Sequence, residues 1–256
     1  MDPLPLSTLD PLPTWILLAL AGLVAGVINT LAGGGSLLTV PLLVFVGLPP
    51  TIANGTNRVG VLVQNLASTL RFRRAGVDGV GEAIPLLIPL LIGSAIGAAL
   101  ASRMPDEIFR RIFGIAMIAL LYPMLRPPRT PSVQAPIAPR SRLLNTSIFF
   151  AIGLYGGAIQ AGVGLILVAA LARSGLDLVR ASAIKVVLIG SLTWVAVPVF
   201  ILHGQVQWLA ASALVVGFAA GGELGARAAI GGGERVIRAA LVIAVLGMAG
   251  RMLELY

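Results

Sequence analysis

The sequence predicts an all-α polytopic membrane protein with two inverted repeats of about four helices each, the first helix of each repeat being broken or re-entrant at a glycine-rich segment. Three observations lead to this prediction: the composition, a similarity between the halves of the chain, and two long apolar stretches that glycines interrupt. Hydrophobic residues make up 57% and charged residues 11% of the 256 residues. Such a composition is typical of membrane proteins and lies outside the range of soluble ones.

The composition also excludes several classes of function. The chain has no cysteine, so disulfides, thiolate catalysis and thiolate metal sites are all ruled out. The formal charge of +8 comes from arginines clustered at helix ends, which predicts a bilayer and no nucleic acid as the partner. Residues 1–13 include Asp2 and Asp10 and no Lys or Arg, unlike a signal peptide, so we expect the first helix to be retained.

Apolar runs predict the membrane helices. Their ranges are 14–47, 52–70, 83–101, 107–125, 143–172, 179–202, 206–229 and 235–253. The stretch 126–142 is rich in proline and arginine and cannot form a helix interior. The predicted domains are therefore a first transmembrane repeat over 1–125, a cytoplasmic linker over 126–142 and a second transmembrane repeat over 143–256.

The two halves resemble each other when the sequence is compared with itself at an offset of 128 residues. The aligned identities include Gly47 with Gly175, Gly76 with Gly204, Gly93 with Gly221, Gly97 with Gly225 and Arg110 with Arg238. Further upstream, GLVAG at Gly22–Gly26 corresponds to GLYGG at Gly153–Gly157 once a short gap is allowed. We therefore expect a duplicated unit, with the glycines of the pairs 93/221 and 97/225 serving as helix-packing contacts.

The stretches 14–47 and 143–172 are too long for simple spans, and glycines interrupt them in AGGGS (32–36) and AGVG (161–164). If each stretch turns back at its glycines, one side of the membrane collects Arg71, Arg73, Arg74, Arg126, Arg129, Arg140, Arg142, Arg173, Arg180, Arg227, Arg235 and Arg238. The other side keeps Arg58, Arg103, Arg110, Arg111 and Arg251. The positive-inside rule favours this arrangement. It makes the halves inverted and places both termini outside the cytoplasm.

A break in a membrane helix leaves backbone groups unpaired, so it must line a cavity or be buried in protein. The residues of the first break are Gly33, Gly34, Gly35 and Ser36, which come at the start of a half-helix over 37–47. Gly162 and Gly164 occupy the corresponding place in the second half. Because a helix N-terminus with exposed amides binds anions, these residues predict an anion site.

Polar residues accompany both breaks. Asn29, Ser36 and Gln160 lie beside the breaks themselves, whereas Thr56, Asn57, Arg58, Ser182 and Lys185 come just before the next helix of each half. Lys185 is the only lysine and aligns with Asn57 at the offset of 128. A cation at the membrane centre costs about 2.5 to 3.5 kcal/mol or more, so we expect Lys185 to neutralise a bound anion. The alternative is a lysine that snorkels to the interface.

Three further titratable residues, Glu223, Arg227 and His203, lie in or near the predicted spans. Glu223 is the one carboxylate well inside a predicted span, and Arg227 follows four residues later. This spacing favours a structural ion pair, and the alternative is a proton-coupling site or a partner for Lys185. His203 lies in a short predicted loop, where a solvated role is expected.

The chain resembles the sulfite exporter TauE/SafE family of membrane permeases. The resemblance rests on GLVAGVINTLAGGGSLLTVPLLVFVGLPPTIANGTNRVG (Gly22–Gly60), on GLYGGAIQAGVG and on ASAIK in the second half. It implies a transporter with two similar halves that acts on sulfite, organosulfonates or related oxyanions, usually as an exporter. The second half departs from the first by lacking the triple glycine and the Gly-Thr pair, so the two breaks need not contribute equally.

Together the residues predict a secondary transporter of a small anion, bound near the midplane between the repeats, in a bacterial inner membrane, and the resemblance implies that the anion is an oxyanion and is exported. The expected partners are the anion and the lipid bilayer, with no metal and no other cofactor. Two alternatives remain: an intramembrane hydrolase acting on a lipid phosphate, and a cation carrier. The hydrolase would need a base with an orienting partner or metal-binding carboxylates, and the cation carrier would need carboxylates at the breaks.

Overall fold

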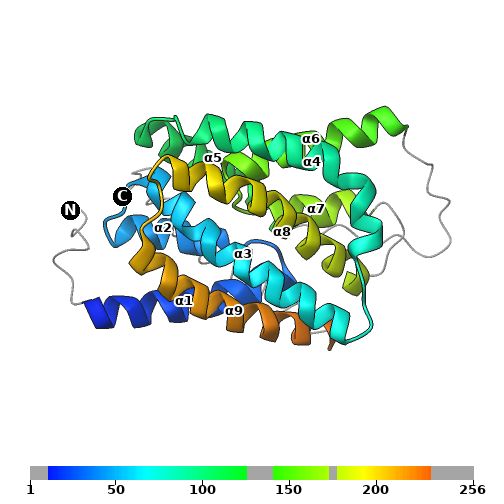
Figure 1. The fold of residues 1–256 in the computed structure, drawn as a ribbon, viewed down its shortest axis with the longest axis horizontal. Helices are drawn as coiled ribbons and strands as arrows, with labels where there is room; N and C mark the ends of the chain where they lie inside the picture. Colours follow the sequence, from blue (N-terminus) through cyan, green and yellow to red (C-terminus); the bar gives the residue numbers. More distant parts are fainter. Residues whose placement is uncertain (1–10, 126–140, 173–177, 232–256) are drawn as a thin grey trace.

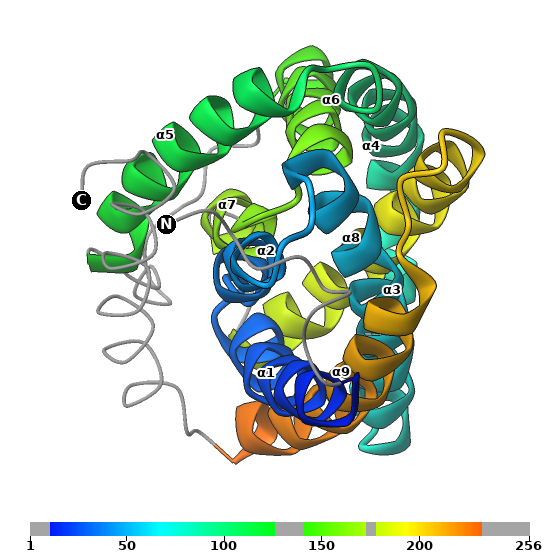
Figure 2. The same ribbon diagram turned by 90° about the vertical axis from the view of Figure 1, so that its left-hand side faces the viewer.

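The computed structural model describes residues 11–125, 141–172 and 178–231, which form nine helices and no strand. The helices are α1 (Pro11–Leu31), α2 (Ser36–Phe45), α3 (Pro50–Arg74), α4 (Val80–Ala101), α5 (Asp106–Leu125), α6 (Arg142–Ala158), α7 (Val163–Ala172), α8 (Leu178–Leu202) and α9 (Trp208–Ile230). They run roughly parallel or antiparallel to one long axis (Figure 1), apart from α5, which is tilted across the side of the bundle (Figure 2).

The helices agree closely with the apolar runs of the sequence. The long run 14–47 is divided between α1 and α2, and the run 143–172 is divided between α6 and α7. The other described runs match single helices to within a few residues, and the run 235–253 lies outside the described residues. The chain is thus helical where it is apolar and interrupted at the two glycine-rich segments.

One boundary was predicted wrongly. The polar residues 54–58 lie inside the predicted run 52–70 but were also expected to precede a helix; α3 begins at Pro50 and contains them, so the second expectation is wrong. Proline suits the first turn of a helix because its missing N–H would have no partner there. The helix continues through the polar residues because their side chains find partners on neighbouring elements.

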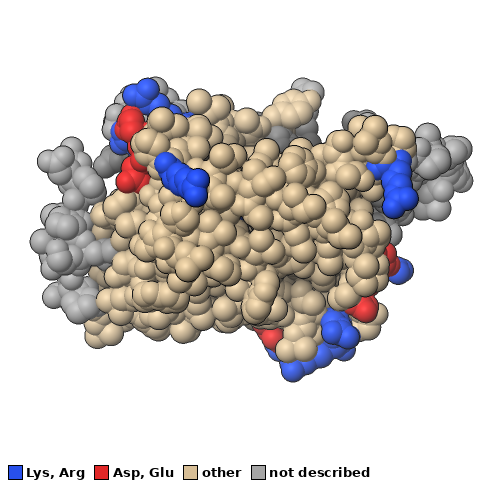
Figure 3. Space-filling model, turned by 45° about the horizontal axis from the view of Figure 1, so that its top comes forward, with Lys and Arg blue, Asp and Glu red and all other residues tan. Residues whose placement is uncertain are grey.

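The outer surface has the character expected in lipid. On α4 the side chains of Ile84, Ile88, Ile92 and Ile96 follow one another every four residues and are 43% to 73% exposed. Charged residues gather towards the ends of the molecule, and the visible face between them is free of charge (Figure 3). Within the described residues, four helices are long and apolar enough to cross a membrane: Leu12–Leu31, Val80–Ala101, Val179–Leu202 and Trp208–Ile230.

Glycines let two pairs of helices approach at backbone distance. On α9, a Cβ added to Gly221 would lie 2.3 Å from the carbonyl oxygen of Leu23 on α1. On α4, a Cβ added to Gly93 would lie 2.2 Å from the carbonyl oxygen of Phe150 on α6. A Cβ added to Gly97 would lie 2.1 Å from the carbonyl oxygen of Leu154, and one added to Gly225 would lie 3.0 Å from that of Val27, so the prediction that these four glycines are packing contacts is confirmed. The pairs α1–α9 and α4–α6 flank a central pair formed by α3 and α8 (Figure 2).

The chain reverses direction at both interruptions. α1 runs from left to right in Figure 1, and α2 returns towards the left, where α3 begins. α6 starts at the opposite end, and α7 returns to that end, where α8 begins. The ends of α1 and α6 therefore lie inside the bundle, and the polar backbone groups at these ends need partners there.

Candidate functional site

The two interruptions meet at the centre of the molecule through their backbones. Gly33 has a φ of +85°, a conformation that favours glycine. A Cβ on Gly33 would lie 2.5 Å from the carbonyl carbon of Gly164, and a Cβ on Gly164 would lie 2.5 Å from the Cα of Gly33. No side chain larger than hydrogen fits between them. The structure thus brings the two predicted glycine-rich segments into one place.

The start of α2 is held by a side chain from α3. The Nδ2 atom of Asn57 donates to the hydroxyl of Ser36 over 2.9 Å, and its Oδ1 atom accepts from the hydroxyl of Thr39 over 2.5 Å. The amides of Leu37 and Leu38 close short turns onto the carbonyl oxygens of the preceding glycines. Asn57 therefore fixes the N-terminal turn of α2 against α3.

Several backbone amides at the interruptions have no hydrogen-bond partner among the described residues. Among the described residues, no hydrogen-bond acceptor faces the N–H groups of Gly34, Gly35, Ser36, Gly162 and Gly164. All five residues are buried. A buried amide without an acceptor is costly, and such amides at a helix N-terminus attract negative charge. The chemistry of both interruptions therefore suits an anion.

The C-terminal end of α1 is bound by the only lysine of the chain. Lys185, on α8, is fully buried, and its Nζ atom donates to the carbonyl oxygen of Thr30 over 2.6 Å. The hydroxyl of Thr30 accepts from Gln64 over 2.8 Å and lies 3.0 Å from the hydroxyl of Ser68. Asn29 donates to the Oε1 atom of Gln64 over 2.5 Å. The first interruption is thus surrounded by a buried polar network that contains one cation.

The C-terminal end of α6 is bound by a cation from α3. Arg58 is fully buried, and its Nη1 atom donates to the carbonyl oxygen of Gly156 over 3.0 Å. Its guanidinium lies over the ring of Phe200, 4.7 Å from the centroid, which is a cation–π contact. One turn earlier, Asn54 donates to the carbonyl oxygen of Ala158 over 3.0 Å. The sequence prediction that Arg58 lies outside the membrane is not supported by this burial.

Gln160 occupies the second interruption itself. It has a φ of +62°, which is unusual for a residue with a side chain. Its Nε2 atom donates to the hydroxyl of Thr193 on α8 over 3.0 Å. Tyr155 donates to the carbonyl oxygen of Ala161 over 2.6 Å. These bonds tie the backbone between α6 and α7 to the central helices.

The remaining candidates lie away from this centre or have other partners. The hydroxyl of Thr56 accepts from the amide of Gln207 and so holds the loop between α8 and α9. Ser182 is buried on α8, one turn before Lys185. Glu223 and Arg227 form an ion pair of 2.8 Å, with side chains 34% and 56% exposed. The ring of His203 is exposed, and its Nδ1 atom lies 2.8 Å from the carbonyl oxygen of Val199.

Sequence reasoning missed several residues of the buried network. Thr39, Gln64, Ser68 and Thr193 were not singled out because each sits in a long apolar run. A signal was nevertheless present on α3. Asn57, Gln64 and Ser68 follow at intervals of seven and four residues, which places them on one face of a helix.

Charge is distributed unevenly between the interior and the ends. In the part of the chain that the structure describes, the buried charged residues are Arg58 and Lys185, and no carboxylate is buried with them. Glu82, Glu107 and Glu223 are not buried, and each forms an ion pair with arginine. The buried charge that the described residues place around the two interruptions is therefore positive.

Comparison with known proteins places the chain in a family. The family model described as "Sulfite exporter TauE/SafE" matches residues 18–252. The chain belongs to this family. Members of the TauE/SafE family that resemble the chain are described as membrane transporters, and the chain is accordingly a membrane transporter.

Three relatives illustrate the similarity. "Probable membrane transporter protein ORF9" of Sinorhizobium sp is 27% identical over 92% of this chain and 91% of its own length. "Probable membrane transporter protein" of Haemophilus influenzae is 28% identical over 90% and 91%. "Probable membrane transporter protein YfcA" of Escherichia coli K12 is 27% identical over 97% and 92%. No solved structure matches the chain.

Proposed function

We propose that this transporter exports a small oxyanion, such as sulfite or an organosulfonate, and binds it where the two helix interruptions meet. The observation that carries the proposal is the positive charge in the interior. Arg58 and Lys185 are fully buried, and none of the described carboxylates is buried with them. A buried cation in a membrane protein is costly unless its charge is used. An anion that enters this region would compensate the charge of the cation it reaches, and the family description supplies the oxyanion and the direction.

The proposed site combines both halves of the chain. It comprises Asn29, Gly33, Gly34, Gly35, Ser36, Asn57 and Lys185 around the first interruption, and Arg58, Gln160, Gly162 and Gly164 around the second. The unpartnered amides would approach the anion's oxygens, and Lys185 at the first interruption or Arg58 at the second would supply the opposite charge. Thr56 and Ser182 would have lesser roles. The hydroxyl of Thr56 already accepts a hydrogen bond from the loop between α8 and α9.

An inverted duplication explains the geometry of the site. At the offset of 128 residues, the bounds of α3, 50–74, fall on those of α8, 178–202, and α4 falls on α9 to within a residue. The packing of α1 on α9 has its counterpart in the packing of α6 on α4. When GLVAG is aligned with GLYGG, Gly33 corresponds to Gly164, and these two residues touch. Equivalent residues that touch would lie on the axis relating the repeats, near the midplane.

The same geometry argues for an orientation in the membrane. Among the described arginines, Arg71, Arg73, Arg74, Arg142, Arg180 and Arg227 lie at the end of the molecule where α3 and α9 finish and α6 and α8 begin (Figure 1). Arg103, Arg110 and Arg111 lie at the opposite end. We assign the first end to the cytoplasm by the positive-inside rule. Linker 126–142 would then be cytoplasmic and both termini would lie outside.

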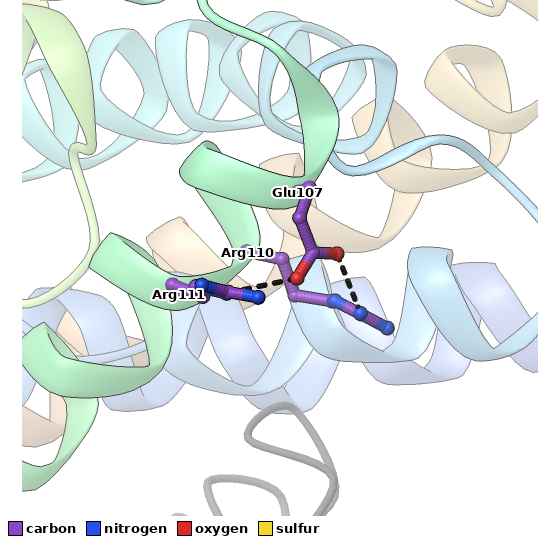
Figure 4. A network of polar contacts seen from close by, with 3 residues as sticks. All are labelled: Glu107, Arg110 and Arg111. Atoms are coloured by element: carbon purple, nitrogen blue, oxygen red, sulfur yellow. Dashed lines mark hydrogen bonds and ion pairs between the residues drawn. The ribbon is translucent and has the colours of Figure 1, made fainter.

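Arginines at the proposed outer end are partly neutralised by a neighbour. Glu107, in the first turn of α5, pairs with Arg110 over 2.7 Å and with Arg111 over 2.8 Å (Figure 4). Its carboxylate also suits the N-terminus of a helix. At the opposite end Arg180 pairs with Glu82 and Arg227 with Glu223, so arginines are paired at both ends and the assignment rests on the number of arginines.

The two alternatives fit the described residues less well. A cation carrier needs carboxylates at the interruptions, and the buried charges found there are an arginine and a lysine. A hydrolase needs a nucleophile or base with an orienting partner. His203, the only histidine, is exposed at the end of α8. The relatives described as transporters also favour transport over catalysis.

Transport in proteoliposomes tests the proposal directly. Purified protein is reconstituted and loaded in turn with sulfite, methanesulfonate, sulfate or chloride, and efflux is measured with and without a proton gradient. We expect efflux of at least one sulfur oxyanion above that of protein-free vesicles, and a marked loss in the Lys185→Ala variant. Transport of sodium or potassium in place of any oxyanion would favour the cation carrier and overturn the proposal.

A further inference from the structure

Arg58 uses only part of its hydrogen-bonding capacity. A guanidinium carries five N–H donors. The Nη1 atom binds the carbonyl oxygen of Gly156, and one face of the group covers the ring of Phe200. The Nε and Nη2 atoms are buried and have no hydrogen-bond partner in the described structure. A buried charged donor left without an acceptor is strongly unfavourable, so this arrangement points to an absent partner.

The two unused nitrogens lie on the same edge of the guanidinium. The N–H bond of Nε and one N–H bond of Nη2 point in parallel along that edge. Two parallel donors match two oxygens on one carboxylate, sulfonate, sulfite or phosphate group. A single round ion such as chloride cannot accept both bonds with two separate atoms. The free edge therefore has the geometry of an oxyanion fork.

The surroundings keep this fork fixed and positively charged. The bond to Gly156 and the contact with Phe200 hold the guanidinium from two sides, so little further ordering is needed when a ligand binds. No described carboxylate is buried with Arg58 to neutralise it. The neighbouring Asn54 and, in the second interruption, Gln160 each have an unpartnered buried side-chain oxygen.

Arg58 is also separated from Lys185 along the transport direction. Arg58 is the ninth residue of α3 and Lys185 the eighth of α8, so each lies about 11 to 12 Å from the start of its helix. These helices begin at opposite ends of the molecule (Figure 1). The two cations thus lie on opposite sides of its middle, Arg58 nearer the proposed outer end.

We propose that the Nε–Nη2 edge of Arg58 is a second anion station, which binds two oxygens of the transported group on the outer side of Lys185. The assignment rests on the proposed oxyanion transport and narrows its substrate class. The substrate must carry at least two oxygens on one central atom. The anion would pass from the ammonium beside the first interruption to the fork beside the second.

Replacing Arg58 by lysine keeps the charge and removes the fork. Sulfite affinity is measured by calorimetry on the purified full chain for wild type, Arg58→Lys and Arg58→Gln, with Arg111→Lys as the matched control on an exposed side chain. We expect Arg58→Lys to lose roughly ten- to a hundred-fold in affinity, Arg58→Gln to lose at least as much, and Arg111→Lys to bind normally.

Different outcomes would overturn the anion station at Arg58 and the proposed oxyanion transport. Wild-type affinity in Arg58→Lys with a loss in Arg58→Gln would mean that only charge matters, and the fork would be wrong. Wild-type affinity in both variants would overturn the station. Water would then fill the space between the free donors of Arg58 and the side-chain oxygens of Asn54 and Gln160. A wild-type protein that neither binds nor transports any oxyanion would instead overturn the proposed function.

A measurement on the wild type covers the case in which the variants do not fold. Arginine-selective labelling with phenylglyoxal is mapped by mass spectrometry in the presence and absence of sulfite. We expect sulfite to protect Arg58 and to leave the exposed Arg111 labelled to the same extent. An unchanged extent of labelling at Arg58, including none in either condition, would overturn the station.

Discussion

The ammonium nitrogen of Lys185 lies 2.6 Å from the carbonyl oxygen of Thr30, in the last turn of α1. The carbonyl groups at a helix C-terminus have no partner within the helix, and a cation there is stabilised by the helix dipole. Lys185 therefore satisfies the end of α1 and at the same time places a positive charge beside the interruption. An anion that binds there would share this ammonium with the carbonyl group.

Replacing Lys185 by alanine should weaken oxyanion binding by roughly ten- to a hundred-fold, because a charge-assisted contact to a buried anion is lost. Lys185→Arg should be intermediate, since it keeps the charge but changes the geometry. Asn57→Ala should weaken binding less, because a neutral hydrogen bond contributes less than a charged one. Calorimetry on purified protein measures all three affinities.

Thermal unfolding separates binding from folding in these variants. Lys185→Ala also leaves the carbonyl group of Thr30 without its partner, so some loss of thermal stability is expected. A variant that is folded and binds the anion with wild-type affinity would remove Lys185 from the site. A loss of affinity that parallels a general loss of folded protein would indicate a structural role alone.

Substituting alanine at Gly33 or Gly164 should lower stability by about 1 to 3 kcal/mol, because each Cβ would overlap the other backbone. The double variant should cost less than the sum, since the first substitution already separates the two interruptions. Thermal unfolding in detergent measures the effects. Gly81→Ala on α4 is the control, because a Cβ there meets nothing within 4 Å. Strict additivity would show that the two glycines do not share a contact.

Neutralising Glu223 should leave transport close to the wild-type rate. Its ion pair with Arg227 is partly exposed, and pairs of this kind contribute about 0.2 to 1 kcal/mol. Transport by Glu223→Gln and Arg227→Gln in proteoliposomes, compared across a range of pH, tests this expectation. A selective loss of proton-driven transport in Glu223→Gln alone would assign the carboxylate to coupling.

The orientation of the chain can be tested with reporter fusions at residue 134 and at the C-terminus. We expect the first reporter in the cytoplasm and the second outside, because the arginines at helix ends then obey the positive-inside rule. A fusion in the loop between α8 and α9, near His203, should report the outer side as well. Reporters at 134 and the C-terminus in the same compartment would contradict the inverted arrangement.

The helices could be predicted from the sequence because the bilayer imposes long apolar runs. Even the divisions between α1 and α2 and between α6 and α7 were indicated, since consecutive glycines disfavour a continuous helix. The positions of Lys185 and Asn57 beside the interruptions followed from polar residues standing in an apolar context. Local composition was sufficient for these features.

The depth of Arg58 could not be predicted in the same way. It belongs to a polar group, 54–58, that reads as a loop when taken alone. Its burial depends on Gly156 and Phe200, which lie about a hundred or more residues further along the chain. Gln64 bonds to Thr30, 34 residues away, and Ser68 to Gly222, 154 residues away, so only the packing of α3 against α1 and α9 reveals these partners.

The close packing of α1 on α9 has a consequence for biosynthesis. The glycine-lined face of α1 that includes Gly22 and Gly26 fits against α9, which is made nearly two hundred residues later. α1 must therefore wait in the bilayer, with this face covered by lipid or by an insertion factor, until most of the chain has been translated. Final assembly of the first half is thus linked to completion of the second, and a ribosome that stalls before α9 leaves α1 without its partner.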